Sequence, residues 1–232
     1  MKLLLCLNRL SDFEVFLNHL ESVSNSKIVS ERNSDSANFL FSIHYLLHEI
    51  DICETGFGIA QSSYKITKAI SQKKYHLALK AGFCNSYKAA LEIGNIVNVI
   101  KDKAGDSGIQ TEDSFQDLYD LQLSNKESFP HFKGAFINMN NSYMNIFLDF
   151  KKVVAVTVNN YANKNSFQLK KEKYLADIET MDGLGFVYAC MYERQPFYQI
   201  NCVERNLETD TTNFDLAKEK LNLTLIDILQ KI

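Results

Sequence analysis

The chain opens with MKLLLCLNRLSDFEVFLNHL, residues 1–20. The first half of this stretch contains an apolar run of strand length, Leu3–Leu7. The second half repeats large apolar side chains at the i, i+3, i+4, i+7 spacing of one helix face: Phe13, Phe16, Leu17 and Leu20. This change of period indicates a strand that leads directly into a helix, which is the unit from which α/β folds are built.

The same alternation continues along the chain. Strands are expected at Phe39–Leu47 (a buried helix is the alternative there), Ile50–Cys53, Leu77–Ala81, Ile96–Ile100, Ala135–Ile137, Val153–Val158 and Phe197–Val203. Helices are expected from Ile59 to Ile70, from Leu184 to Met191 and from Ala217 to Leu229, with residues 101–130 as a polar surface excursion. We therefore predict an α/β fold, a three-layer α/β/α sandwich around a central mixed or mainly parallel sheet. The absence of repeats and linkers favours one domain over residues 1–232.

Composition excludes several classes of function. The chain has 25 basic and 28 acidic side chains, a net charge of −3, so no electrostatic argument favours nucleic acid. Its apolar runs are far shorter than the roughly 20 residues that span a bilayer, and the N-terminal run is too short for a signal peptide. Five cysteines without a Cys-x-x-Cys pair indicate neither a disulfide framework nor a zinc site. We expect a cytoplasmic protein with reduced thiols, no membrane partner and no nucleic-acid partner.

Common catalytic signatures are missing. The sequence contains no P-loop, no Gly-x-Ser-x-Gly elbow and no His-Glu-x-x-His motif. His44 and His48 have helical spacing, but the residues around them alternate as in a strand. The pair is therefore interpreted as ordinary histidines, and no metal or organic cofactor is expected.

Four ordered segments carry a resemblance to a known family. They are Met1–Leu5 followed by Asp12-Phe13-Glu14; Thr55-Gly56-Phe57-Gly58; Ala81–Ser86 followed by Gly94–Val97; and Glu179–Gly183 followed by Pro196-Phe197 and the strand to Val203. In this order the chain resembles the nucleoside phosphorylase/nucleosidase superfamily, over its whole length. Val156-Thr157-Val158-Asn159 favours its futalosine hydrolase branch over the methylthioadenosine nucleosidases.

The resemblance implies hydrolysis of an N-glycosidic bond through an oxocarbenium-like state. It implies that Glu14 orients the attacking water, that Asp182 (Glu in the family) holds the ribose, and that Met181 packs under the sugar. It further implies that Tyr161 stacks on the purine, and that Gly82, Phe83 and Asn159 border the substrate. The alternatives for three of these residues are a solvated first-turn Glu14, a core Met181 and a surface Tyr161.

The chain departs from the family pattern at several positions. Asn85 replaces a glycine and is expected to bring a side chain into the pocket wall. Asn95 replaces an aspartate, and Gln110 and Thr111 replace an acidic pair. Arg205 stands where relatives carry the Asp or Asn that faces purine N7. An arginine cannot relay a proton, but it can stabilise negative charge on the leaving base; alternatively it pairs with Glu204 or Glu208.

Three functions remain open at this stage. The first is a nucleosidase that acts on futalosine or a related 5′-substituted purine nucleoside. The second is a paralogue without turnover that binds nucleosides or serves a structural role. The third and weakest is a phosphorylase, because Phe83 takes the place of a small polar phosphate contact. By resemblance, a homodimer or higher homo-oligomer is expected.

Overall fold

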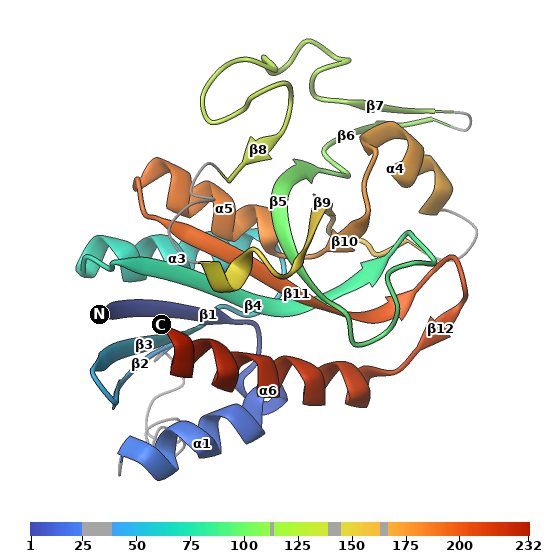
Figure 1. Ribbon diagram of the computed structural model, residues 1–232. Helices are drawn as coiled ribbons and strands as arrows, with labels where there is room; N and C mark the ends of the chain where they lie inside the picture. The colour runs from blue at the N-terminus through green and yellow to red at the C-terminus, as the bar shows by residue number, and fades with distance from the viewer. Residues whose placement is uncertain (25–38, 112–113, 139–144, 163–166) are drawn as a thin grey trace.

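The computed structural model describes residues 1–24, 39–111, 114–138, 145–162 and 167–232 (Figure 1). Its first elements confirm the strand–helix unit of the opening sequence. Strand β1 (Lys2–Leu7) runs into a short 3₁₀ turn, η1 (Leu10–Phe13), and then helix α1 (Glu14–Ser24). The predicted helix face is the buried one, since Phe13, Phe16, Leu17 and Leu20 are at most 1% exposed.

The main sheet is mixed, as predicted. Its remaining strands are β2 (Leu40–Tyr45), β3 (His48–Glu54), β4 (Leu77–Ser86), β5 (Ile96–Ala104), β8 (Phe136–Ile137), β9 (Lys151–Thr157), β10 (Ile178–Thr180), β11 (Phe197–Asn206) and β12 (Thr211–Thr212). Strands β3, β1, β4 and β11 are mutually parallel neighbours. Strands β2, β5 and β10 pair antiparallel with β3, β11 and β4 respectively.

Strand β4 closes part of this sheet on itself. Its first half, from Leu77 to Ala81, pairs with β1 on one side, and its last residues pair with β10 on that same side. Its other side pairs with β11 along nearly the whole strand. Because β11, β5, β9 and β10 are also joined in that order, the strands form a ring that returns to β4. The ends of β1, β4 and β11 are thereby brought together.

Helices cover both faces of the sheet and confirm the three-layer arrangement (Figure 1). Helix α1 packs with α6 (Phe214–Lys231) on one face. On the other face α3 (Ile59–Gln72) packs with α5 (Gly183–Tyr192). Each pair buries its own apolar cluster against the strands.

Three local differences from the sequence prediction have physical causes. Strand β5 extends to Ala104, into the expected surface excursion, and buries Asp102. Helix α4 (Phe167–Tyr174) was not predicted, because its lysine-rich sequence buries just Phe167 and Tyr174, which are too few to show a helical period; β10 was not predicted because it has only 3 residues. The excursion itself forms the β6–β7 hairpin (Gly108–Gln110 and Phe115–Asp117), and a second 3₁₀ turn, η2 (Asn145–Phe147), precedes β9.

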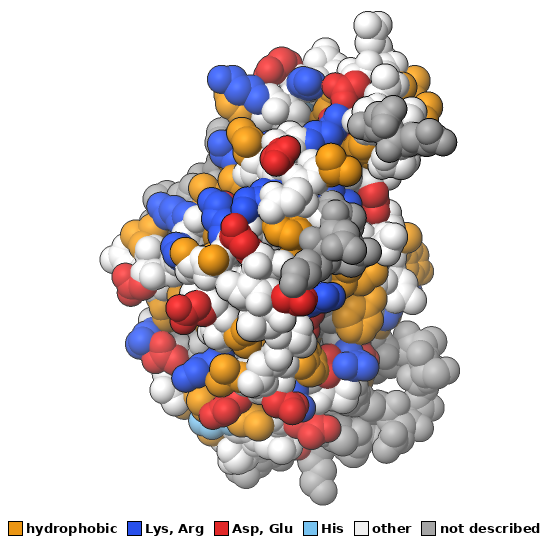
Figure 2. Space-filling model, turned by 90° about the vertical axis from the view of Figure 1, so that its right-hand side faces the viewer, with side chains coloured by type: hydrophobic (Ala, Val, Ile, Leu, Met, Phe, Trp, Pro, Cys, Tyr) orange, Lys and Arg blue, Asp and Glu red, His pale blue; other side chains and the backbone are white. Residues whose placement is uncertain are grey.

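Residues 39–54 form a strand pair rather than a buried helix. His44 and His48 lie on adjacent antiparallel strands, and His44 is exposed. Among the described residues no group of three or more His, Cys, Asp or Glu side chains could hold a metal ion. The same part of the chain contains no helix long and apolar enough to cross a membrane. Acidic and basic side chains are interspersed over the face in Figure 2.

Candidate functional site

A cavity of about 160 Å³ opens where the parallel strands end. It is lined by Asn8, Arg9, Asp12, Phe57, Phe83, Tyr161, Met181, Asp182, Glu204 and Phe214. Asn8 follows β1, Phe57 follows β3, and Phe83 and Glu204 come from the last residues of β4 and β11. Ligands of open α/β sheets commonly bind at the carboxyl ends of the strands, and this cavity occupies such a position.

Two carboxyl groups face this cavity from opposite ends of the sequence. Asp12 lies in η1. Its backbone carbonyl accepts a 3.0 Å hydrogen bond from the buried side-chain amide of Asn222 on α6. Its carboxylate accepts two hydrogen bonds from the Arg9 guanidinium, at 3.0 and 2.9 Å. Burial raises the pKa of Glu204 to about 7, and the nearby charge of Asp12 adds to this shift. The cavity therefore combines an ionisable acid near neutrality with a second carboxylate.

Strand β11 is irregular where Glu204 enters the cavity. Val203 pairs with Cys84 and Arg205 with Asn85, so Glu204 is skipped in the register, as in a β-bulge. Bulges redirect a side chain and are common beside active sites. Val203 is buried, Glu204 half-buried and lining the cavity, and Arg205 does not line it.

A third carboxylate, that of Asp182, forms the floor of the cavity. Its Oδ1 lies 3.1 Å from the ammonium of Lys80, and its Oδ2 accepts a 2.8 Å hydrogen bond from Asn8. Lys80 lies in the buried strand β4 and is 1% exposed. Gly82 approaches this group closely, since a Cβ there would lie 2.8 Å from Lys80 Nζ and 2.9 Å from Asn8 Oδ1.

Aromatic rings form the walls. The Phe83 ring packs against Phe13 and edge-on against Phe214, with centroid distances of 5.8 and 4.9 Å. The Arg9 guanidinium lies 5.8 Å from the centroid of Phe57. Burial raises the pKa of Tyr161, so its hydroxyl stays neutral. Aromatic walls with a few convergent polar groups suit a flat heterocyclic ligand.

Several residues that the sequence singled out meet here. Phe83, Tyr161, Met181 and Asp182 all line the cavity, and Gly82 lies beside the Lys80–Asp182 pair. Sequence reasoning assigned no role in a binding site to Glu204, Lys80 or Asp12. The bulge hides Glu204, because simple strand alternation does not identify a skipped residue.

Three expected site residues are not brought to the cavity. Glu14 is exposed at the start of α1, while Asp12, two residues earlier in the preceding turn, points inward. Arg205 lies 3.9 Å from Asp210 in a partly exposed ion pair, whereas Glu204 occupies the cavity wall. Asn159 is exposed and donates to Asp106 from its backbone and its side chain. These placements correct the expected positions of all three side chains.

Asn85, near the end of strand β4, also turns away from the cavity. Its amide donates to Glu179 at 2.9 Å, and the Tyr87 hydroxyl donates to the same carboxylate at 2.6 Å. Asn85 is 3% exposed and does not line the cavity. It therefore satisfies a buried acid and does not narrow the ligand space, contrary to the expectation that its side chain enters the pocket wall.

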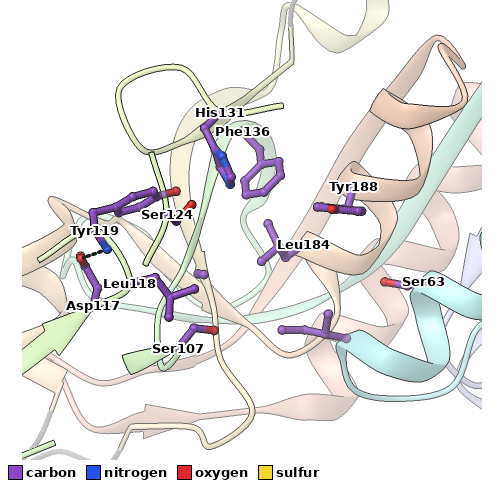
Figure 3. Close-up of a pocket in the computed structure, with 12 residues that line it drawn as sticks. Ser63, Ser107, Asp117, Leu118, Tyr119, Ser124, His131, Phe136, Leu184 and Tyr188 are labelled. Atoms are coloured by element: carbon purple, nitrogen blue, oxygen red, sulfur yellow. Dashed lines mark hydrogen bonds between the residues drawn. The ribbon is translucent and has the colours of Figure 1, made fainter. Parts of the chain in front are cut away.

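A second, larger cavity of about 390 Å³ lies between the excursion and helices α3 and α5 (Figure 3). Tyr119 and Ser124 come from the excursion, and His131 directly follows it. Across from them lie Leu184 and Tyr188 on α5 and Ser63 on α3. The side chains that line this cavity include a single carboxylate, that of Asp117, which accepts a 2.9 Å hydrogen bond from the backbone of Tyr119. Because this cavity has one carboxylate in addition to His131, it cannot supply the carboxylate pair that the first cavity has, and the first cavity is the better candidate for chemistry by paired carboxyl groups.

Comparison with known proteins identifies the fold. No family model matches the sequence, and no curated protein matches it. The structure superimposes on the 5′-methylthioadenosine/S-adenosylhomocysteine nucleosidase of Campylobacter jejuni with a TM-score of 0.78 at 15% identity, covering 100% of this chain and 98% of that one. The futalosine hydrolase of Helicobacter pylori gives 0.77 at 14% identity, with 100% and 98% coverage. The 5′-methylthioadenosine nucleosidase of Arabidopsis thaliana gives a TM-score of 0.75 at 15% identity, with 99% and 94% coverage. The chain thus has the fold of these nucleosidases, members of the nucleoside phosphorylase/nucleosidase superfamily.

Proposed function

We propose that the protein is a nucleosidase that hydrolyses the N-glycosidic bond of futalosine or a related 5′-substituted purine nucleoside. The observation that carries this proposal is the meeting of Asp12, Asp182 and Glu204 around one aromatic-walled cavity. The likeness to nucleosidases of two specificities supports the reaction class. By resemblance the reaction belongs to menaquinone biosynthesis in the cytoplasm and uses no metal or organic cofactor.

In this proposal Glu204 is the general acid and Asp12 orients the water. Protonated Glu204 donates its proton to the purine as the bond between C1′ and the base nitrogen breaks, which leaves a neutral base. Water then forms the new bond to C1′, and its proton passes to a carboxylate of the site. Asp182 accepts hydrogen bonds from the sugar hydroxyls, and Met181 packs under the ring. The roles assigned at first to Glu14 and Arg205 pass to Asp12 and Glu204.

The side-chain lengths of the two acids differ from the superfamily pattern in opposite directions. The resemblance expects a glutamate near the water and an aspartate or asparagine at the purine. Here the shorter Asp12 lies at the first position and the longer Glu204 at the second. One side chain has lost a methylene and the other has gained one, so the combined reach of the pair across a substrate is kept.

The direct test is base release by purified protein. We expect hypoxanthine from futalosine, measured chromatographically, with methylthioadenosine and inosine as comparison substrates. Asp12→Asn and Glu204→Gln should each lower kcat by about 100-fold or more. Glu14→Gln and Arg205→Gln are the matched controls. Glu14 lies two residues from Asp12 and Arg205 one residue from Glu204, and neither side chain lines the cavity. Both variants should keep kcat within about threefold of the wild-type value.

A nucleoside-binding protein without turnover is the second candidate. Two contacts favour it: Arg9 engages the Asp12 carboxylate twice, and Lys80 neutralises Asp182. This candidate predicts calorimetric binding of futalosine with no base released after prolonged incubation. Release that depends on Asp12 and Glu204 would exclude it.

A further inference from the structure

Lys80 is a lysine whose ammonium lies in the core of the protein. It lies in the middle of β4, whose residues are buried almost throughout, and its side chain is 1% exposed. A buried ammonium is strongly destabilising unless a counter-charge lies beside it. The Lys80 ammonium lies 3.1 Å from Asp182 Oδ1, and the Asp182 side chain is itself 3% exposed.

A second side chain, that of Asn8, fixes the Asp182 carboxylate of the ion pair. Asn8 donates to Asp182 Oδ2 at 2.8 Å, so the two oxygens of the carboxylate are held by different neighbours. Neither Lys80 Nζ nor Asn8 Oδ1 has a hydrogen-bond partner of good geometry in the described part of the chain. Both atoms converge on Gly82, where any Cβ would lie within 3 Å of each. The carboxylate therefore has one fixed orientation and a compensated charge.

We propose that Lys80 is a positioning residue that sets the effective charge of the sugar-binding carboxylate, and thereby the preference of the site between neutral and cationic sugars. This inference rests on the proposed function, because it assumes that Asp182 contacts the sugar. In hydrolysis the sugar becomes positively charged at the transition state. A free carboxylate beneath it attracts that charge, whereas a carboxylate paired with an ammonium attracts it far less.

The consequence is a site that tolerates the ground-state nucleoside but stabilises its cation weakly. Uniform binding of substrate and transition state does not raise kcat. Lys80 thus holds the shortened carboxylate in place at the expense of turnover. Substitutions that change the net charge of the Lys80–Asp182 pair should therefore change how tightly the site binds a cationic sugar.

The experiment compares two ligands over four proteins. One ligand is a purine nucleoside with a neutral sugar; the other is a pyrrolidine analogue whose protonated ring nitrogen mimics the sugar cation, of the kind bound to H. pylori methylthioadenosine nucleosidase. The proteins are the wild type, Lys80→Gln, Asp182→Asn and the double variant. Calorimetric Kd values are measured at one pH, so the readout does not require turnover.

Lys80→Gln should tighten the cationic analogue by roughly tenfold and change the Kd of the neutral nucleoside by no more than about threefold. Asp182→Asn, which leaves the ammonium alone, should weaken the cationic analogue by at least the same factor. The double variant has the same net charge as the wild-type pair and should return the ratio of the two Kd values to near the wild-type ratio. It also removes both buried charges, so it reports on the site even if a single variant fails to fold.

An unchanged ratio in Lys80→Gln, or a double variant that follows either single variant, would overturn the role of Lys80 while nucleoside binding itself persists. If no protein of the four binds either ligand, the proposed function fails, and this inference fails with it.

Discussion

Glu204 titrates near neutral pH because burial disfavours its charged form and Asp12 lies nearby. A general acid must be protonated, so its catalytic contribution is present below its pKa and lost above it. We expect kcat/KM to fall as the pH rises through about 7. Glu204→Gln should remove this decline together with most of the activity. A decline that persists in the variant would assign the titration to another group.

The buried carboxyl group of Asp102 makes the free energy of unfolding depend on pH. Burial raises the pKa of this carboxyl to about 7, although Thr157 donates to it at 2.9 and 3.0 Å. The folded state therefore keeps a proton that the unfolded chain releases at lower pH. Between about pH 4 and 7 the folded state binds more protons, so this group makes the free energy of unfolding decrease as the pH rises.

Asp102→Asn should flatten the dependence of unfolding free energy on pH between about 4 and 7, measured by urea denaturation. The exposed Asp149→Asn is the matched control and should leave the slope unchanged. A steep slope that survives in Asp102→Asn would attribute the effect to other buried acids, such as Glu204 and Glu179, whose pKa values burial also raises.

At the scale of elements, α6 holds the turn that carries Asp12. Asn222 on α6 is 1% exposed; it accepts a 2.9 Å hydrogen bond from the backbone of Phe16 and donates to the carbonyl of Asp12. Asn222→Leu leaves both backbone groups buried without partners, and we expect a loss of about 2–4 kcal/mol of stability. Since η1 then loses its anchor, kcat should also fall. Leu223→Ala, on the exposed side of α6, should stay within about 0.5 kcal/mol in the same denaturation experiment.

The sequence predicted the elements better than it predicted the site. Apolar periodicity located β1, α1, α3, α5 and α6, because each buries one continuous face. It could not locate α4, whose buried side chains, Phe167 and Tyr174, lie at its two ends with polar residues between them, nor the bulge that turns Glu204 inward. Phe83, Met181 and Asp182, which the sequence singled out as substrate-binding residues, line one cavity, and their roles stay predictions. The exchange of Glu14 for Asp12 depends on the exact path of a 3₁₀ turn, which periodicity does not specify.

For the whole molecule, we propose that a second copy covers the face formed by α5 and the excursion. Tyr192 packs against Phe129 and Tyr188 with centroid distances of 5.2 and 4.6 Å, yet these three rings are 49%, 64% and 43% exposed. Such a cluster, next to the larger cavity, is typical of an interface.

Sedimentation equilibrium should give about twice the chain mass of 26.6 kDa. Tyr192→Lys should shift the protein toward the monomer, because it places a charge in the apolar cluster. Leu47→Lys is the control, since Leu47 is 93% exposed in the turn between β2 and β3. A wild-type monomer at micromolar concentration would contradict the proposal.

The ring that β4 closes also determines when, during synthesis, the site can exist. Strands β1, β3 and β4 leave the ribosome early, but the long partner of β4, β11, spans residues 197–206 and emerges more than 110 residues after β4 ends. Until then one edge of β4 has no β11 to pair with, and unpaired edges are prone to the wrong association. Glu204 arrives with that strand, and the support of Asp12 arrives still later with Asn222. Asp12 is synthesised early, but the nascent chain acquires the opposing acid Glu204 and then the Asn222 anchor of Asp12 only late, after most of the sheet has had time to form.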